Sequence, residues 1–458
     1  MNITRRLLLA ALASAALIGC TTAPPAAPTA AAQPPIVLVH GNGDNAALWQ
    51  TTIWRFESNG WPSDRLVAID MPNPLARDDD TKPQPGRSSA EESAKILAAA
   101  VDQVLQRTGA RQVVLVANSR GGNAVRNYVQ NFGGAAKVSH VVLGGTPNHG
   151  VWADAALRPN SEFNGAGPFL LGLNAPKGAN GDEVTPGPKW LTVRSNNNDK
   201  FAQPDGVWIG SKGKPTHVSF DGPALKGATN VVLDDRDHRE VSFHALAFEQ
   251  AYTFITGHAP ARLDIVPQAA PVLDGLVSGY GPAGHNLPLV SATLEVFAVD
   301  AASGQRVGAA RYRTSVGADG RWGPFTADPN TPYEFVVAAI GYAQTHVYRS
   351  PFPRSSNVVN LRAERLAAAD SDAAAVITLS RPRGYFGVPR DRIVFDGISP
   401  APGLPTGVAG VSSSKIKLKE GAGRSIVAEF ESGAINERIV GIAWPAEGNR
   451  VVILELTQ

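Results

Sequence analysis

The chain has 458 residues, 43% of them hydrophobic, and a formal net charge of +2 with only 18% charged residues. This balance of charge gives no reason to expect a nucleic-acid partner, because such partners bind strongly basic surfaces. No group of cysteines and histidines has the spacing of a metal site, and the length is enough for two or three domains.

The first twenty residues have the pattern of an export signal. Arg5 and Arg6 precede an apolar run over residues 7–19 that is too short to span a bilayer comfortably. The run ends in Leu-Ile-Gly-Cys, closing at Cys20, and this tetrapeptide resembles a bacterial lipobox. The resemblance implies cleavage before Cys20 and acylation of its sulfur. The alternative is an unmodified thiol in a signal that is cleaved elsewhere.

We therefore expect residues 1–20 to be a signal peptide with lipobox Cys20, exported by the Sec or the Tat route. Residues 21–34 are rich in Ala, Pro and Thr, which is typical of a flexible tether. By resemblance to Gram-negative lipoproteins, Thr21 after the cysteine favours an anchor in the outer membrane or at the cell surface.

Strands and helices are predicted to alternate from residue 35 to residue 258. Apolar runs indicate strands at 36–39, 66–69, 113–117, 138–143, 190–193 and 231–233, and apolar stripes indicate helices at 88–107, 123–132 and 240–254. The alternation predicts an α/β domain with a mostly parallel sheet. Ligands of such sheets bind at the carboxyl ends of the strands. The residues found just after a predicted strand include His40, Ser119, Asp199 and His238.

Ser119 lies in the sharp turn between the strand at 113–117 and the next helix. The residues two before and two after it, Ala117 and Gly121, are small, because a larger Cβ there would collide with the neighbouring strand or helix. Strand, turn and helix together are the context of a nucleophile elbow, so we expect Ser119 to be a nucleophile. A Gly-rich turn without chemistry is the alternative.

The sequence His40-Gly41-Asn42-Gly43 directly follows the first strand, where an oxyanion hole is expected. Acyl transfer places negative charge on the carbonyl oxygen, and losing one preorganised N–H donor for that charge costs roughly 3–4 kcal/mol. We expect the donors to be the backbone N–H groups of Asn42 and Arg120. A Gly-rich turn without a ligand is again the alternative.

The general base and its carboxylate are expected late in the domain. His238 follows the last strand and precedes the last helix, which is the position of the base when the chain order is Ser, Asp, His. His244, on the helix, is its rival. Asp199 follows the penultimate strand and would fix the imidazole tautomer, with Asp205 and Asp182 as alternatives.

These motifs resemble bacterial true lipases of the α/β-hydrolase superfamily. The resemblance covers residues 35–258 and rests on segments 39–43, 117–122 and 144–147 and on the surroundings of His238. It implies an ester or lipid substrate, a Ser-His-Asp acyl-enzyme mechanism and no metal or organic cofactor. The family usually has His where this chain has Asn118, and hydrophobic residues where it has Arg120 and Asn42. We therefore expect a more polar rim of the acyl pocket than in a long-chain lipase.

Two loops are candidates to cover the site. Residues 72–87 are polar and rich in Pro, Asp and Gly, whereas residues 147–188 form a long Gly- and Pro-rich segment with apolar anchors. A loop of that length is usually functional or disordered. We expect the second loop to be a substrate-binding cap, and a surface insertion is the alternative.

After residue 259 no long helical stripe recurs, and short strands with turns predict an all-β, sandwich-like region. We expect a β-sandwich-like domain at 262–365 and a second β-rich domain at 366–458, or one larger β domain. This arrangement resembles an archaeal lipase whose hydrolase domain carries a C-terminal β domain for lipid substrate. A module that only stabilises the first domain is the alternative.

The sequence thus predicts a lipid-anchored serine hydrolase of carboxylic esters such as acylglycerols, short-chain esters or aliphatic polyesters. An inactive surface lipoprotein that uses the scaffold for binding is one alternative. A thioesterase or amidase on the same fold is another, because fold does not fix function.

Overall fold

The computed structural model describes residues 33–279 and 285–458. The predicted signal peptide, Cys20 and most of the predicted tether lie outside these residues. Residues 34–458 form one structural unit. No helix within the described ranges is both long and apolar enough to cross a membrane.

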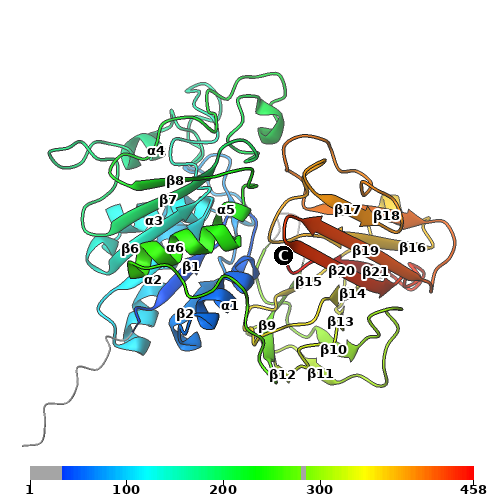
Figure 1. Cartoon of the computed structure of the whole chain (residues 1–458). Helices are drawn as coiled ribbons and strands as arrows, with labels where there is room; N and C mark the ends of the chain where they lie inside the picture. The colour runs from blue at the N-terminus through cyan, green and yellow to red at the C-terminus, as the bar shows by residue number, and fades with distance from the viewer. Residues whose placement is uncertain (1–32, 280–284) are drawn as a thin grey trace, which may run out of the picture. The chain divides into compact units, whose positions relative to one another are not determined.

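Six strands form a parallel sheet in the first half of the chain (Figure 1). All neighbouring pairs are parallel, in the order β2, β1, β5, β6, β7, β8. The strands are β1 (Ile36–Val39), β2 (Leu66–Ile69), β5 (Val113–Asn118), β6 (Val138–Gly144), β7 (Lys189–Ser195) and β8 (Thr229–Leu233). The predicted parallel α/β sheet is thus confirmed.

Helices cover both faces of this sheet. The core of one face joins Val37 and Leu115 to α2 (Ala90–Thr108) and α3 (Arg120–Asn131). The core of the other face joins alternate residues of the same strands to α1 (Gln50–Ser58) and α6 (Ala245–Thr256). Because successive side chains of a strand point to opposite faces, the continuous apolar runs fill both cores.

The predicted single helix at 240–254 is wrong, because the chain leaves the helical conformation at His244. α5 (Glu240–Phe243) ends there with ψ 153°, and the side chain of His244 accepts the N–H of Leu246 as the N-cap of α6.

The start of α2 is a capping box between Ser89 and Glu92. One further short helix is α4 (Pro168–Leu173), and the short strands β3 (Leu75–Ala76) and β4 (Arg87–Ser88) pair in the loop over residues 72–87.

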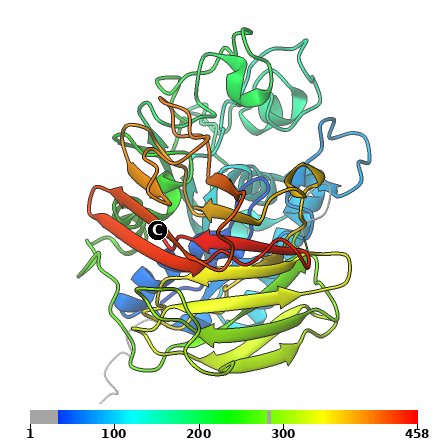
Figure 2. The ribbon, with the colours of Figure 1, turned by 90° about the vertical axis from the view of Figure 1, so that its right-hand side faces the viewer.

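The chain beyond residue 271 is built from strands in three sheets (Figure 2). The largest has the order β11, β10, β13, β14, β21, β16, β18, and two three-stranded sheets have the orders β12, β9, β15 and β17, β19, β20. The strands are β9 (Val272–Gly279), β10 (Thr293–Ala298), β11 (Tyr312–Ser315), β12 (Arg321–Thr326), β13 (Tyr333–Ala338), β14 (Gln344–Arg349), β15 (Leu361–Ala363), β16 (Ala375–Ser380), β17 (Arg392–Phe395), β18 (Ser413–Leu418), β19 (Ser425–Ser432), β20 (Ile435–Ile442) and β21 (Arg450–Glu455). The predicted β-rich C-terminal region is confirmed.

β21, near the end of the chain, lies between β14 and β16 and runs parallel to both. One sheet therefore continues across the predicted boundary between residues 365 and 366. α1 joins this region to the α/β part: Trp54 is buried in the β core and donates its indole N–H to the carbonyl of Ser355 at 2.8 Å.

Candidate active site

Ser119 lies between the end of β5 and the start of α3 in strained backbone geometry, with φ 52° and ψ −124°. Its own N–H donates to the carbonyl of Gly144 at 2.9 Å. A Cβ added at Gly121 would lie 2.5 Å from the carbonyl oxygen of Val39, which explains why a glycine is needed two residues after the serine. The neighbouring strand β1 therefore passes directly behind the turn, and the turn itself holds Ser119 in place.

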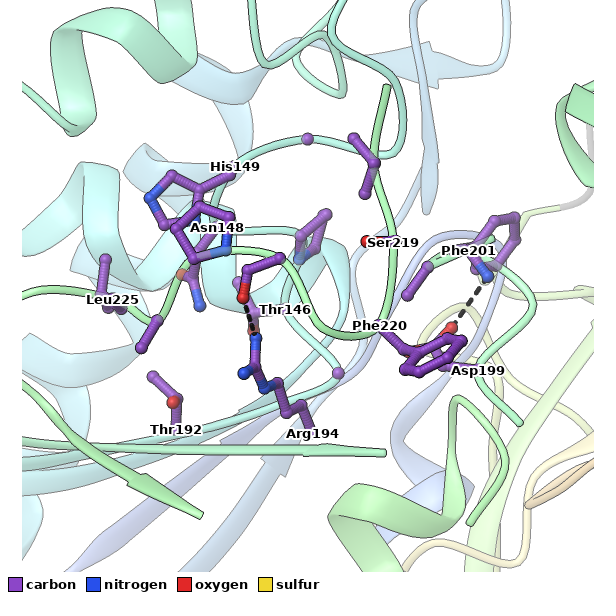
Figure 3. Close-up of a pocket in the computed structure, with 18 of the residues that line it drawn as sticks. Thr146, Asn148, His149, Thr192, Arg194, Asp199, Phe201, Ser219, Phe220 and Leu225 are labelled. Atoms are coloured by element: carbon purple, nitrogen blue, oxygen red, sulfur yellow. Dashed lines mark hydrogen bonds between the residues drawn. The ribbon is translucent and has the colours of Figure 1, made fainter. Parts of the chain in front are cut away.

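His238 and Asp199 meet although they come from segments after different strands. The imidazole Nδ1 lies 2.9 Å from each carboxylate oxygen of Asp199, and both side chains are buried. Asp199 also accepts the N–H of Phe201 at 2.8 Å (Figure 3). The carboxylate thus favours the tautomer with the proton on Nδ1, which leaves the lone pair on Nε2. Within the described residues, Nε2 has no hydrogen-bond partner.

The two predicted oxyanion donors lie at the ends of adjacent strands, β1 and β5. A Cβ added at Gly41 would lie 3.0 Å from the Cβ of Ser119, so the backbone before Asn42 approaches the serine closely. In the described part of the chain, the backbone N–H groups of Asn42 and Arg120 donate to no partner. The side chain of Asn42 accepts the N–H of Ala76 at 2.8 Å, which fixes this turn.

The side chain of Arg120 adds no charge to the rim of the site. Its guanidinium forms a buried two-point ion pair with Glu162 at 2.8 and 2.9 Å. It also donates to the carbonyls of Pro74 and Ser88 at 3.0 and 2.7 Å. The unusual residue after the serine therefore ties the start of α3 to both predicted covering loops.

Asn118, the other departure from the family pattern, is also buried. Its amide lies 3.1 Å from the carbonyl oxygen of His238 and 2.8 Å from Oγ of Ser242. The residue before the predicted nucleophile thus holds the main chain of the predicted base. Sequence reasoning connected Asn118 only with a more polar rim of the acyl pocket, and Asn118 does not line the cavity at Ser119.

The alternative residues lie elsewhere. Burial, reinforced by nearby Arg236, lowers the pKa of His244 to about 4. Asp205 accepts the N–H of Val207 at 2.8 Å, and Asp182 pairs with Lys177 through the backbone. None of these three residues contacts His238 or Ser119 in the structure. His40 accepts the N–H of Met71 at Nε2, and burial lowers its pKa, so it is neutral.

A cavity of about 250 Å³ opens beside Ser119. Both predicted covering loops line it, and so does a segment after Asp199 that the sequence analysis did not assign to the site. Its walls are Asn42, Ala76, Arg77, Asp78 and Arg87; Val151, Trp152, Arg158, Ser161 and Phe163; and Phe201, Trp208 and Ile209. Its polar rim therefore comes from surface loops and not from Arg120.

Phe201 also lines a second cavity, of about 370 Å³ (Figure 3). Asp199 and Phe201 line it together with polar side chains such as Thr146 and His149. Phe201 borders both cavities. Its ring packs edge-on against that of His238, with the two ring centres 4.7 Å apart. Within the described ranges no three His, Cys, Asp or Glu side chains form a cluster that could hold a metal ion.

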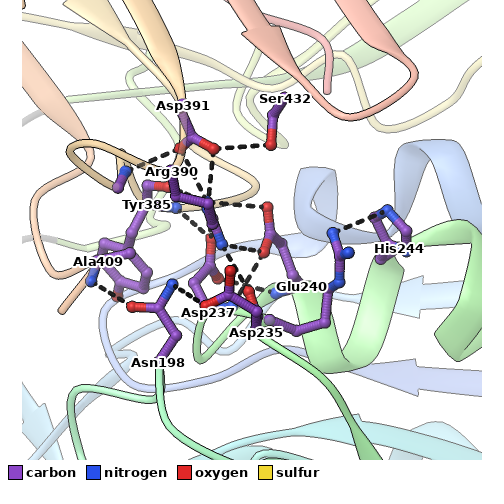
Figure 4. A network of polar contacts seen from close by, with 12 residues as sticks. Asn198, Asp235, Asp237, Glu240, His244, Tyr385, Arg390, Asp391, Ala409 and Ser432 are labelled. Carbon is purple, nitrogen blue, oxygen red and sulfur yellow. Dashed lines mark hydrogen bonds and ion pairs between the residues drawn. The ribbon is translucent and has the colours of Figure 1, made fainter. Parts of the chain in front are cut away.

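The residue before His238 is held by the C-terminal β region (Figure 4). Asp237 is fully buried and accepts from Arg381 at 3.1 Å and from the N–H of Tyr385 at 2.8 Å. Glu240 accepts from Arg381 and from Arg390, each at 2.7 Å. Burial first, and then the nearby Glu240 carboxylate, raise the pKa of Asp237. Buried ion pairs thus attach the segment that carries His238 to the β region.

Comparison with known proteins gave two family matches. Residues 34–176 match the model of the alpha/beta hydrolase fold, and residues 272–366 match the model of the lipase C-terminal domain. Similar solved structures include the Bacillus licheniformis lipase BlEst2 in its mature form, at 23% identity and TM-score 0.36 over 50% of this chain and 94% of that one. The propeptide form of the same lipase matches at 14% identity and TM-score 0.36 over 90% and 94%. Aspergillus fumigatus lipase B matches at 17% identity and TM-score 0.34 over 50% and 54%. The chain thus combines an alpha/beta hydrolase fold with a lipase C-terminal domain.

Proposed function

We propose that this protein hydrolyses carboxylic esters, with Ser119 as nucleophile, His238 as general base and Asp199 as the carboxylate that orients it. The observation that carries the proposal is the buried His238–Asp199 pair, at 2.9 Å to both oxygens. The amide of Asn118, the residue before Ser119, lies 3.1 Å from the carbonyl oxygen of His238 and links this pair to the turn in which Ser119 has φ 52°. A buried imidazole nitrogen without a partner is costly. It is also the atom that a serine proton requires as its acceptor.

The reaction follows from this arrangement. His238 Nε2 takes the proton of Ser119 Oγ as the oxygen attacks the ester carbonyl, and the N–H groups of Asn42 and Arg120 hold the oxyanion. The tetrahedral intermediate expels the alcohol, which receives the proton from His238. Water, deprotonated by the same imidazole, then attacks the acyl-enzyme. The bond between the acyl carbon and Ser119 Oγ breaks, Oγ takes the proton back from His238, and the acid is released. Asp199 stabilises the imidazolium in both halves of the reaction.

Replacement of the nucleophile tests the proposal directly. Ser119→Ala is expected to lower kcat for p-nitrophenyl butyrate on the order of 10⁶-fold while the circular dichroism spectrum stays unchanged. A fluorophosphonate probe is expected to label the wild type and not the variant. Retained turnover in the variant would overturn the assignment, and an unlabelled wild type without ester turnover would indicate an inactive binding scaffold.

Thioesters and amides can react by the same steps, so the leaving group needs its own comparison. We favour oxygen esters because both family matches are to hydrolase and lipase models. Matched butyryl substrates with an oxygen, sulfur or nitrogen leaving atom would distinguish the three activities. A higher kcat/KM for the thioester or the anilide than for the ester would overturn the preference.

We also propose that the protein is exported and anchored by lipid on Cys20, at the outer membrane or cell surface. The support is the Arg5-Arg6 pair, the apolar run and the Leu-Ile-Gly-Cys sequence. Metabolic labelling with an alkyne fatty acid is expected to mark the wild type but not Cys20→Ser. Equal labelling of both proteins would contradict the anchor.

A further inference from the structure

One wall of the cavity at Ser119 comes from the segment between β7 and β8. Phe201, Trp208 and Ile209 line the cavity, and they follow Asp199 within ten residues. Trp208 and Ile209 belong to a 3-10 turn over Gly206–Ile209, which the side chain of Asp205 caps by accepting the N–H of Val207. The segment that supplies the orienting carboxylate therefore also supplies an aromatic wall of the cavity.

The C-terminal β region forms hydrogen bonds with the residues on both sides of Asp199. The N–H of Ala409 donates to Oδ1 of Asn198 at 2.7 Å (Figure 4). The ammonium of Lys200 donates to the carbonyl of Gly410 at 2.9 Å and lies 4.0 Å from the ring centre of Tyr385. These contacts come from two connections of the β region, before β17 and between β17 and β18. We call Tyr385, Ala409 and Gly410 the β clamp.

Gly410 packs directly against the cavity wall. A Cβ at this position would lie 2.1 Å from Cη2 of Trp208 and within 2.5 Å of two further atoms of the same indole. The backbone of Gly410 is not in the left-handed region, so the glycine is needed for this close approach and not for a turn. The indole therefore lies between the β clamp and the cavity, in contact with both.

We propose that the β clamp sets the length of the acyl chain that the enzyme accepts, by fixing Trp208 as the end wall of a short acyl pocket. This proposal rests on the proposed ester hydrolysis at Ser119. The cavity of about 250 Å³ is smaller than the ~300–1,000 Å³ of pockets for drug-sized ligands. For an acyl pocket that Trp208 closes, this size favours esters of short-chain acids, and the β region then acts on specificity as well as on stability.

Two variants move the wall in opposite directions. Trp208→Ala removes the indole and lengthens the pocket, whereas Gly410→Ala pushes the indole away from the clamp and into the cavity. Gly317→Ala is the matched control, because a Cβ at Gly317 would have only an ordinary contact, 3.6 Å from a side-chain oxygen of Asp319, and Gly317 is not in the left-handed region. The readout is kcat/KM of the full chain for the p-nitrophenyl esters of acetate, butyrate, hexanoate, octanoate and decanoate.

One methylene in an apolar pocket is worth about 10- to 200-fold in discrimination. The octanoate-to-butyrate ratio of kcat/KM is therefore expected to rise at least ~10-fold in Trp208→Ala and to fall in Gly410→Ala, with Gly317→Ala matching the wild type. Fluorophosphonate labelling of Ser119 is measured in parallel. Normal labelling with an unmoved chain-length profile in Trp208→Ala would overturn the acyl-pocket proposal alone, whatever the folding of Gly410→Ala. An unlabelled wild type without ester turnover would instead overturn the proposed function.

Discussion

Removal of Arg381 tests whether the β region positions the predicted base. The Arg381 guanidinium is fully buried and bridges Asp237 and Glu240, the residue before His238 and the first residue of α5. Arg381→Met would leave these two buried carboxylates facing Arg390 alone, at 4.0 Å from Asp237 and 2.7 Å from Glu240. Arg390 already pairs with Asp391 at 2.8 Å, so three carboxylates would then share one positive charge.

Breaking a buried ion pair by removing one partner costs about 3–5 kcal/mol of unfolding free energy, and we expect a loss of this size at pH 7. Part of the cost is avoided when Asp237 keeps a proton, since burial already raises its pKa. A carboxyl with a raised pKa in the folded state loses stability as pH rises through that pKa. The deficit of the variant should therefore be larger at pH 7 than at pH 5.

A positioning role also predicts a change in kinetics. A displaced His238 should lower kcat for p-nitrophenyl butyrate by roughly 10- to 100-fold with little change in KM, and Arg381→Lys should restore part of it. Arg383→Met is the control, because Arg383 is equally buried but donates to the carbonyls of Thr457 and Leu456. Urea unfolding at both pH values and steady-state kinetics are the measurements. Equal losses of stability in the two Met variants, with unchanged kcat and no pH dependence of the difference, would refute the positioning role.

Two other substitutions test the surroundings of His238. Asn118→Ala removes the hydrogen bonds to the carbonyl of His238 and to Oγ of Ser242. The unfolding free energy measured in urea should fall by about 1–3 kcal/mol, and kcat should fall as well. An unaltered kcat would mean that these bonds do not position His238. His244→Asn keeps a capping side chain but removes a group whose folded pKa is about 4. Between pH 6.5 and 4 the unfolded wild type binds a proton at His244 that the folded state does not. The unfolding free energy of the wild type should therefore decrease by up to ~3 kcal/mol as pH is lowered from 6.5 to 4, and the variant should lack this contribution. The same dependence on pH in both proteins would contradict a neutral imidazole at His244.

The parallel sheet could be predicted from the sequence because its signals are local. Runs such as Val113–Ala117 are apolar without interruption, as buried parallel strands must be. Ser119, Asp199 and His238 were expected near one another because all three follow strands of one parallel sheet. The proximity of His238 to Asp199, at 2.9 Å, agrees with that reasoning.

The contacts that hold these segments could not be predicted, because their partners are far apart in the chain. Arg381 is 144 residues from Asp237, and Ala409 is 211 residues from Asn198. A local pattern gives an arginine in a loop no reason to be fully buried, since arginine is almost never buried unless paired. The break at His244 was missed for a similar reason, because its N-cap role depends on the packing of two helices and not on local propensity.

The β region contacts the segment of Asp199, the proposed orienting carboxylate, and the segment of His238, the proposed base, in chemically different ways. Buried ion pairs hold Asp237, the residue before His238. The segment of Asp199 is held instead by the hydrogen bond from Ala409, by Lys200 over the ring of Tyr385 and by the contact with Gly410. Tyr385 takes part in both: its N–H donates to Asp237, and its ring lies under Lys200 and under Arg239 at 4.0 and 4.5 Å. Contacts that share a residue are not energetically independent. We therefore expect the orientation of the proposed base His238 and the position of Trp208 to be coupled through Tyr385.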